Sequence, residues 1–351
     1  MTDSLFRFIQ AQSIVAAEAG LIPDGMLRMI IRRLCATRAA AERGHGRTST
    51  VFAREMMHRA VATHTQQANT QHYEVSSALF RAVLGRSMKY SACIFPSADA
   101  TLDTAESATL ALTCERAELE DGMRVLDLGC GWGSLTSYIS EHYPRCHVTA
   151  VSNSTTQRSW IQETCTKPGW GPVDVVTADA ANFELGKARF DRIISIEMFE
   201  HMRNWHVLFN RIAAALTSDG AFFLHVFCHR AHPYFFEDEG ELDWMTRHFF
   251  AGGIMPSFDL PQCIPGPLSV ETTWQVNGRE YGRTLRCWLD RLDRRRAEVE
   301  GILREYLDTR AAGRAVQRWR MFFMACEELF NFDHGREWFV GQYRLRAEGH
   351  S

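Results

Sequence analysis

Short apolar runs alternate with helix-like segments from residue 121 onward, and this alternation constrains the fold more than any other feature of the sequence. The apolar runs lie at 123–127, 147–151, 173–177, 190–196 and 221–227. Runs of this length separated by helices are typical of a parallel sheet that is covered on both faces. We therefore predict a doubly wound α/β sheet. Residues 268–276 and 338–345 are predicted to add two further strands. Two helices, over about 282–309 and 312–330, are predicted between these strands.

The regions around this core differ in composition, and they divide the chain into five predicted parts. The parts are an N-terminal helical extension and linker (1–70), a lid segment that contributes to the ligand site (71–120), the core (121–230), an inserted cap (231–266) and the C-terminal strands and helices (267–351). Residues 1 to about 60 carry apolar side chains at helical spacing, while the polar stretch 41–70 is predicted to be a linker. Four arginines are predicted to form a solvated helix face, with binding to a membrane surface as the alternative. They are Arg28, Arg32, Arg33 and Arg38.

Composition limits the classes of partner that we expect. The 351 residues carry a formal net charge of -3, which gives no reason to expect nucleic acid. We find neither a secretory signal nor the ~18 uninterrupted apolar residues of a membrane span, so no stable membrane insertion is expected. The ten cysteines are scattered, which predicts reduced thiols in a cytoplasmic protein. No carboxylate or cysteine lies at ligand spacing from His229, His232 or His248, so no metal site is expected.

The first predicted strand leads into a glycine-rich turn, Asp127-Leu-Gly-Cys-Gly-Trp-Gly133. Gly129 and Gly131 allow the backbone to turn sharply and to approach a ligand closely. The spacing Gly-x-Gly-x-Gly differs from the Gly-x-Gly-x-x-Gly of dinucleotide-binding turns. The Asp127 carboxylate would repel a pyrophosphate, whereas it suits the amino group of a methionine moiety. The turn therefore favours S-adenosyl-L-methionine (SAM) as the ligand.

Two later turns carry side chains that suit a nucleoside. Asn153 and Gln157 follow the second strand, about 20 residues beyond the glycines, where a partner for the ribose hydroxyls is expected. Asp179 follows the third strand beside Ala180, and its carboxylate is placed to accept a hydrogen bond from an adenine amino group. Ligands of open α/β sheets bind at the carboxyl ends of the strands, so these turns are expected to meet at one edge.

Several longer motifs carry a family resemblance. They are His72-Tyr-Glu-Val75, Lys89-Tyr-Ser91, Val125–Gly133, Asn153–Gln157, Ser195–Met202, Phe227–His229, Asp243–Arg247 and Phe249–Ser257. With them the chain resembles the cyclopropane fatty acid synthase superfamily, and within it the coclaurine-type N-methyltransferases, from about residue 14 to 346. The resemblance implies a class I SAM-dependent methyltransferase (Rossmann-like) fold with a seven-stranded sheet. It adds Tyr90 and Ser91 as contacts to the methionine end of the cofactor. It also supports a nucleoside site made of Gly129, Asn153, Gln157, Asp179 and Ala180.

The run Glu197-Met-Phe-Glu-His201 follows the fourth strand. If this run turns helically, its three- and four-residue spacings bring Glu197, Glu200 and His201 to one face. An amine of pKa about 9 to 10 must lose a proton before it can attack a methyl group, and carboxylates and imidazole can take that proton. Our hypothesis is that Glu200 and His201 handle the proton, while Glu197 anchors the amine or orients the other two. The alternative is that these residues only brace a helix, but the resemblance implies catalysis at these positions.

The resemblance leaves two kinds of acceptor open. In the lipid-modifying branch it implies a bound bicarbonate, held by a cysteine after Tyr-Ser, a glutamate, a histidine on the fifth strand and a tyrosine in the late helix. This chain retains Glu200 and His225 but has Ala92 for the cysteine and phenylalanine at 322 and 323 for the tyrosine. Glu197 is an extra acid. These differences favour a small alkaloid-like or aryl-alkyl amine as the acceptor over an unsaturated acyl chain or an amino-lipid. A third alternative, a protein that binds SAM without catalysis, is less favoured than either kind of enzyme.

Aromatic side chains in the cap and the late helix are candidates for the wall of an apolar acceptor pocket, although aromatics at helical spacing can equally belong to the core. They are Tyr234, Phe235, Phe236, Trp244, Phe249, Phe250, Trp319, Phe322 and Phe323. The N-terminal helices are a candidate contact for a homodimer.

Overall fold

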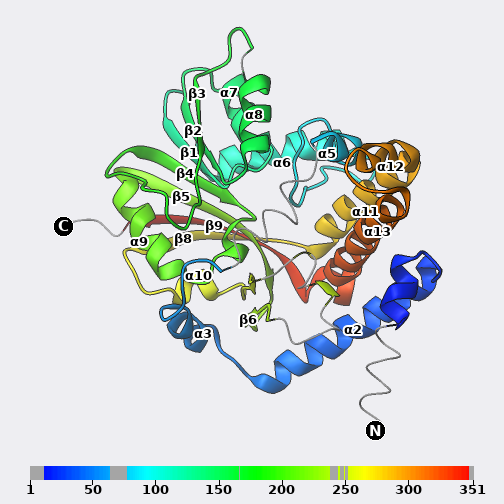
Figure 1. Cartoon of the computed structure of the whole chain (residues 1–351). Coiled ribbons are helices and arrows are strands. Elements are labelled where there is room, and N and C mark those ends of the chain that lie inside the picture. Colours follow the sequence, from blue (N-terminus) through cyan, green and yellow to red (C-terminus); the bar gives the residue numbers. More distant parts are fainter. Residues whose placement is uncertain are drawn as a thin grey trace.

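The computed structural model describes residues 12–63, 77–165, 167–237, 244–245, 249 and 252–347. At its centre lies a seven-stranded sheet in the order β3-β2-β1-β4-β5-β9-β8 (Figure 1). The strands are β1 (Arg124–Leu128), β2 (His147–Ser152), β3 (Val173–Thr177), β4 (Phe190–Ile196), β5 (Leu216–His229), β8 (Leu268–Val276) and β9 (Trp338–Ala347). Each predicted strand is present, and the predicted doubly wound α/β fold is confirmed.

The sheet is parallel from β3 to β5 and antiparallel at its other edge, where β9 pairs with both β5 and β8. The prediction of a parallel sheet therefore holds for five strands only. The first residue of β9, Trp338, pairs with the last residue of β5, His229. Strand β8 runs in the same direction as β5 and ends level with the carboxyl end of β5, so the chain enters β9 at that end and runs in the opposite direction.

Helices cover both faces of the sheet. One face packs against α9 (Trp205–Ala215), α3 (Ser49–Met56) and α10 (Leu260–Cys263). The other packs against α6 (Leu102–Arg116) and α7 (Ser134–His142), with α8 (Thr155–Thr164) beside β2 and β3. Successive side chains of a strand point to opposite faces, so each central strand contributes to both cores.

A second group of helices packs together beside the sheet, on the right of Figure 1. It contains α2 (Asp24–His45), α5 (Ser77–Val83), α11 (Gly278–Arg294), α12 (Arg296–Arg304) and α13 (Thr309–Asn331). A short turn, η3 (Phe332–Gly335), joins α13 to β9. In the part of the chain that the structure describes, no helix combines the length and the apolar character that crossing a membrane requires. All ten cysteines are free thiols.

The predicted cap contains a two-stranded antiparallel sheet of β6 (Tyr234–Phe235) and β7 (Ile254–Met255). Trp244 of the same segment donates a hydrogen bond to Glu18 of the N-terminal region at 2.9 Å. The motif residues 72–75, 243, 246–247 and 250–251 lie outside the described residues, as does His248.

The N-terminal region differs from the prediction in two respects. The predicted linker 41–70 is wrong over most of its described part, since α2 continues to His45 and α3 follows after three residues. Thr48 caps α3 by accepting a hydrogen bond from the Val51 amide, and Phe52 and Met56 of α3 are buried. A short apolar face in a polar stretch is thus enough to anchor this helix.

Arg28 is the second difference. Its guanidinium donates to Glu327 at 2.8 Å and to Glu328 at 2.7 Å, and only 13% of its side chain is exposed. The prediction of a solvated arginine face is therefore wrong for Arg28, which fastens α2 to α13, although Arg32, Arg33 and Arg38 are exposed.

Candidate active site

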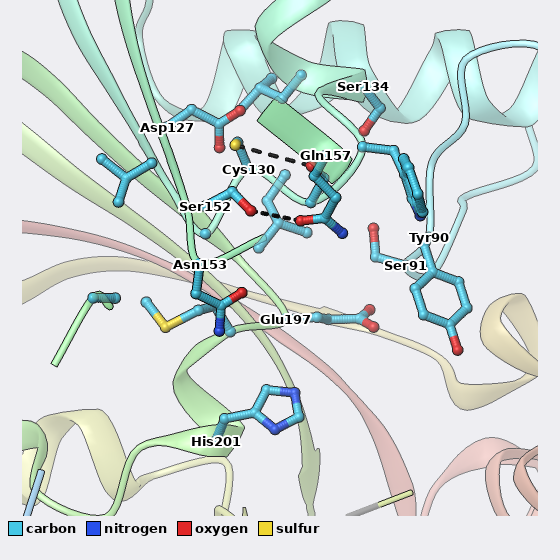
Figure 2. A pocket seen from close by; sticks show the side chains of 18 of the residues that line it. Tyr90, Ser91, Asp127, Cys130, Ser134, Ser152, Asn153, Gln157, Glu197 and His201 are labelled. Carbon is cyan, nitrogen blue, oxygen red and sulfur yellow. Dashed lines mark hydrogen bonds between the residues drawn. The ribbon is translucent and has the colours of Figure 1, made fainter. Parts of the chain in front are cut away.

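A cleft lies at the carboxyl ends of β1 to β4, where the turns after these strands meet (Figure 2). Eleven of the twelve predicted site residues line it: Tyr90, Ser91, Asp127, Gly129, Gly131, Asn153, Gln157, Asp179, Ala180, Glu197 and His201. Glu200 is the exception. Strand order reverses between β1 and β4, so the cleft also lies where an open α/β sheet is expected to bind its ligand.

Two glycines of the turn after β1, Gly129 and Gly131, are required for different local reasons. Gly129 and Gly131 both have positive φ angles, 84° and 53°. A Cβ at position 129 would lie 2.6 Å from Cγ of Met198, which is too close, whereas a Cβ at position 131 would meet nothing within 4 Å. Gly129 therefore permits close packing of the turn, and Gly131 leaves space open in the cleft.

Asp127 presents a buried carboxyl group to the cleft. Only 2% of the residue is exposed, and Oδ2 accepts a hydrogen bond from the Thr136 hydroxyl at 2.7 Å. Burial raises the pKa of Asp127 to about 6, against the opposing effect of the Thr136 hydrogen bonds. A cationic group of a ligand would stabilise the ionised form of this side chain.

Gln157 offers a hydrogen-bond donor at the centre of the cleft. Its Oε1 accepts from the Ser152 hydroxyl at 2.6 Å, which fixes the orientation of the amide. Its Nε2 is buried and has no hydrogen-bond partner among the described residues. Asp179 lies after β3, where one carboxylate oxygen accepts from the Ala181 amide at 2.9 Å.

Tyr90 and Ser91 lie across the cavity from Asn153 (Figure 2). The fully buried Lys89 holds this segment, because its ammonium group donates to the Ser91 hydroxyl at 2.6 Å and to the Ala92 carbonyl at 2.5 Å. The sequence motif contained Lys89, but nothing in its spacing indicated this bracing role.

These side chains fit SAM. Asp127 would face the amino group of the methionine moiety, Gln157 keeps an unused donor for the ribose, and Gly131 leaves the space that the ligand would need. Asn153 and Asp179 line the same cleft, and nucleoside contacts stay a prediction for both. When bound, SAM supplies a methyl group on a positively charged sulfur, already activated for transfer.

Glu197 stands at the end of β4 with a φ of +48°, a backbone conformation that non-glycine residues rarely adopt. Its Oε1 accepts from the Ala92 amide at 2.9 Å and from Nε2 of His225 at 3.2 Å, and its Oε2 accepts from the Tyr281 hydroxyl at 2.6 Å. Burial would raise the pKa of Glu197, but the hydrogen bond and the electrostatic attraction of the His225 ring, the charge of Lys89 and the hydrogen bond from Tyr281 outweigh it and hold that pKa below its ordinary value. The carboxylate is therefore ionised at neutral pH.

Glu200 has the opposite character. It belongs to the 3-10 helix η1 (Phe199–His201), is 1% exposed, and accepts from the Phe227 amide at 2.7 Å. Its other oxygen is buried with no partner among the described residues. Burial, followed by the charge of Glu197, raises the pKa of Glu200 well above its ordinary value.

The prediction that a helical turn carries all three residues on one face is wrong. The helix η1 begins at Phe199, so Glu197 lies before it. The direction of the Glu197 side chain is set by the positive φ of this residue and not by a helical turn. Glu197 and His201 still both reach the cleft (Figure 2). Glu200 is buried and is not among the residues that line the cleft.

The sequence missed Tyr281, which donates to Glu197 from the first turn of α11. The resemblance implies a tyrosine near positions 322 and 323 of α13, but the hydroxyl comes from Tyr281 on α11, 84 residues away from Glu197 in the chain. No local motif marks Tyr281, and only its hydrogen bond to Glu197 assigns it a role. The described residues contain no group of three or more His, Cys, Asp or Glu side chains arranged to hold a metal ion.

None of the described aromatics proposed for the acceptor wall lines the cleft. Phe249 stacks on Phe322 at 4.1 Å between ring centroids, and Trp319 contacts both rings. Through Phe80 this cluster reaches Tyr90, which does line the cleft. Their contact with an acceptor stays a prediction.

The sequence was compared with known families and proteins. The family described as mycolic acid cyclopropane synthetase matches residues 61–336. The chain belongs to this family. It is 34% identical to (S)-coclaurine N-methyltransferase of Thalictrum flavum subsp. glaucum, over 94% of each chain. It is 30% identical to cyclopropane-fatty-acyl-phospholipid synthase of Escherichia coli (strain K12), over 72% of this chain and 66% of the relative.

A crystal structure of coclaurine N-methyltransferase bound to N-methylheliamine and SAH superimposes with a TM-score of 0.89 and 30% identity, covering 95% of this chain and 99% of that one. The class I fold, the cleft and these relatives together establish the chain as a SAM-dependent methyltransferase of the family.

Proposed function

We propose that the enzyme transfers the methyl group of SAM to the amine nitrogen of a small alkaloid-like or aryl-alkyl amine. The observation that carries this proposal is the ionised Glu197 carboxylate, held by three donors at the wall of the cofactor cleft. An anion there attracts an ammonium group and has no comparable partner in an acyl chain. The N-methyltransferase relative and the N-methylheliamine in the matched crystal structure support the same class of acceptor.

The two glutamates suit different parts of the reaction. Glu197 has a lowered pKa, so it anchors the ammonium but is a poor proton acceptor. His201 lines the cleft, which supports a role for its imidazole in taking the proton from the amine. Glu200 is buried beside it, and its raised pKa suits it to exchanging that proton rather than to binding substrate. Once the nitrogen lone pair is free, alignment with the methyl group is the remaining task of the site.

Modification of a lipid is the second candidate. It is supported by the family name, by the E. coli relative and by exposed apolar side chains on α2, namely Met26, Met29, Ile30 and Leu34, next to Arg32 and Arg33. The same apolar side chains are a candidate contact for a homodimer. The free thiols of all ten cysteines fit a reducing compartment, and we propose the cytoplasm.

The test is to incubate the enzyme with SAM carrying a labelled methyl group and two panels of acceptors. One panel contains secondary and tertiary amines on aryl-alkyl frameworks, and the other contains vesicles of unsaturated phospholipid. We expect label in amine products that have gained one methyl group. Label in the lipid fraction alone would overturn the proposal, and label in neither panel would argue against both acceptor classes.

A further inference from the structure

A chain of hydrogen bonds runs from α6 through the sheet to Glu197, and its central bond, between Gln342 and His225, is buried. Arg116, the last residue of α6, donates from its guanidinium to Oε1 of Gln342. Nε2 of Gln342 lies 2.9 Å from Nδ1 of His225, and Nε2 of His225 lies 3.2 Å from Oε1 of Glu197. Gln342 on β9 and His225 on β5 are direct register partners, and each is 1% exposed.

The arginine decides the direction of every bond in this chain. A guanidinium only donates hydrogen bonds, so the amide oxygen of Gln342 must face Arg116. The amide NH2 group of Gln342 then faces His225 and can only donate, so Nδ1 of His225 must accept. A neutral imidazole carries its single proton on the other nitrogen, so Nε2 donates to Glu197.

A protonated His225 would conflict with this arrangement, because an Nδ1–H group would face the NH2 group of Gln342, donor against donor. Burial lowers the pKa of His225, and the nearby cations Lys89 and Arg116 act in the same direction, against the hydrogen bond and the charge of Glu197. The donor pattern around Nδ1 and the burial of the ring together hold the imidazole neutral.

We infer that Gln342, oriented by Arg116, is a positioning residue that fixes the Nε2–H tautomer of His225 and so directs a neutral donor at the Glu197 carboxylate. A neutral donor holds the carboxylate in place without cancelling its charge. An imidazolium would form an ion pair with Glu197 and leave less negative potential for the substrate ammonium. The kinetic part of this inference rests on the proposed amine methylation, while the tautomer does not.

The tautomer is tested by NMR of the full-length protein with 15N-labelled histidine. The His225→Asn variant identifies the His225 signals among the 14 histidines. We expect a protonated Nε2 and an unprotonated Nδ1 at pH 7 in the wild type. In Gln342→Glu a carboxylate replaces the NH2 group, so Nδ1 should become protonated. An Nδ1–H tautomer in the wild type, or unchanged nitrogen shifts in Gln342→Glu, would overturn the inference.

Kinetics separate positioning from a merely structural role. In Gln342→Glu we expect the KM for the amine to rise about 10-fold, with SAM affinity within twofold and a new titration of His225 in the pH profile. The groups facing that ring are Glu197, Lys89 and Arg116, with Tyr281 on the other oxygen of Glu197.

Gln317→Glu is the matched control, since Gln317 is a buried glutamine of α13 that donates to the Ala17 carbonyl, outside this chain of bonds. It should leave the amine KM and the pH profile unchanged. Equal effects of the two variants would refute positioning. If no amine is methylated, the proposed function fails while the NMR result still decides the tautomer.

Discussion

The two halves of the cleft are built in different ways. The cofactor half is assembled from turns that each follow a strand of the parallel sheet, so Asp127, Asn153 and Asp179 reach it from neighbouring strand ends. The acceptor half depends on partners far apart in the chain. Glu197 accepts hydrogen bonds from Ala92 on a loop, His225 on β5 and Tyr281 on α11. These partners are separated from Glu197 in the sequence by 105, 28 and 84 positions, respectively. The cofactor half is therefore readable from local motifs, whereas in the acceptor half a local run marks Glu197 and His201 and only packing supplies the partners of Glu197.

If the two halves are functionally separate, Glu197→Gln should lower kcat/KM for the amine and leave the affinity for SAM nearly unchanged. The variant loses the charge and turns an NH2 group toward donors, since Ala92, His225 and Tyr281 all donate to this side chain. Loss of a buried, hydrogen-bonded charge costs about 4 kcal/mol, so kcat/KM for the amine should fall ~10³-fold. Steady-state kinetics give this value, and titration calorimetry should give a SAM affinity within threefold of the wild type.

The control is Glu42→Gln on α2, where the buried glutamate pairs with Arg38 outside the cleft. This variant should retain wild-type kinetics. A Glu197→Gln enzyme with normal kcat/KM would show that the carboxylate does not hold the ammonium.

Glu200→Gln separates two proposed roles within the acceptor half, ammonium binding by Glu197 and proton exchange by Glu200. If Glu200 exchanges the substrate proton, kcat should fall ~10²-fold with SAM affinity unchanged. A glutamic acid with a raised pKa makes the fold less stable as pH rises above the ordinary pKa, because the unfolded chain ionises more easily. A glutamine has no such linkage, so the thermal unfolding temperature at pH 8 should be at least that of the wild type. A lower unfolding temperature with unchanged kcat would assign Glu200 a structural role only.

Asp127→Asn is the converse test, because it should weaken SAM binding and leave amine binding unchanged. The variant keeps the size and the hydrogen bond from Thr136 but removes the charge that would face the amino group of SAM. A charge-assisted hydrogen bond is worth about 1.5 to 3 kcal/mol, so the dissociation constant of SAM should rise ~50-fold by calorimetry. At saturating SAM the amine KM should stay normal. A large change in amine KM instead would mean that the two halves are coupled.

The pH dependence of SAM binding provides a related test. Asp127 must be ionised to attract the ammonium group, and its pKa is about 6 before the ligand binds. The affinity should therefore be constant above about pH 7 and fall by up to ~10-fold per pH unit below 6. Calorimetry between pH 5 and 8 measures this, and Asp127→Asn should remove most of the slope. A flat wild-type profile would contradict the raised pKa.

The same contrast explains which features the sequence predicted. Strand positions follow from apolar runs. The meeting of Asp127, Asn153 and Asp179 in one cleft follows because parallel strands end at one edge of the sheet. Tyr281 and Gln342 were not predicted because helix α11 and strand β9 reach Glu197 and His225 through tertiary packing, which residue spacing does not encode. The positive φ of Glu197 likewise has no signature in a run of non-glycine residues, and Arg28 looked solvated because its partners are 299 and 300 positions away.

Gly131→Ala has the smallest expected effect, and it distinguishes two roles of Gly131: to allow the positive φ of the turn, or to leave space for the cofactor. Alanine at φ 53° should lower the free energy of unfolding by about 1 to 2 kcal/mol, and its methyl group would enter space lined by the cofactor residues. Gly46, at the end of α2, is a close match because its φ is 59° and a Cβ there also meets nothing within 4 Å. Both alanine variants should lose similar stability in urea unfolding, but only Gly131→Ala should weaken SAM binding, by about 10-fold. Equal SAM affinity in the two variants would mean that Gly131 serves the turn alone, and that the open space beside it does not receive the cofactor.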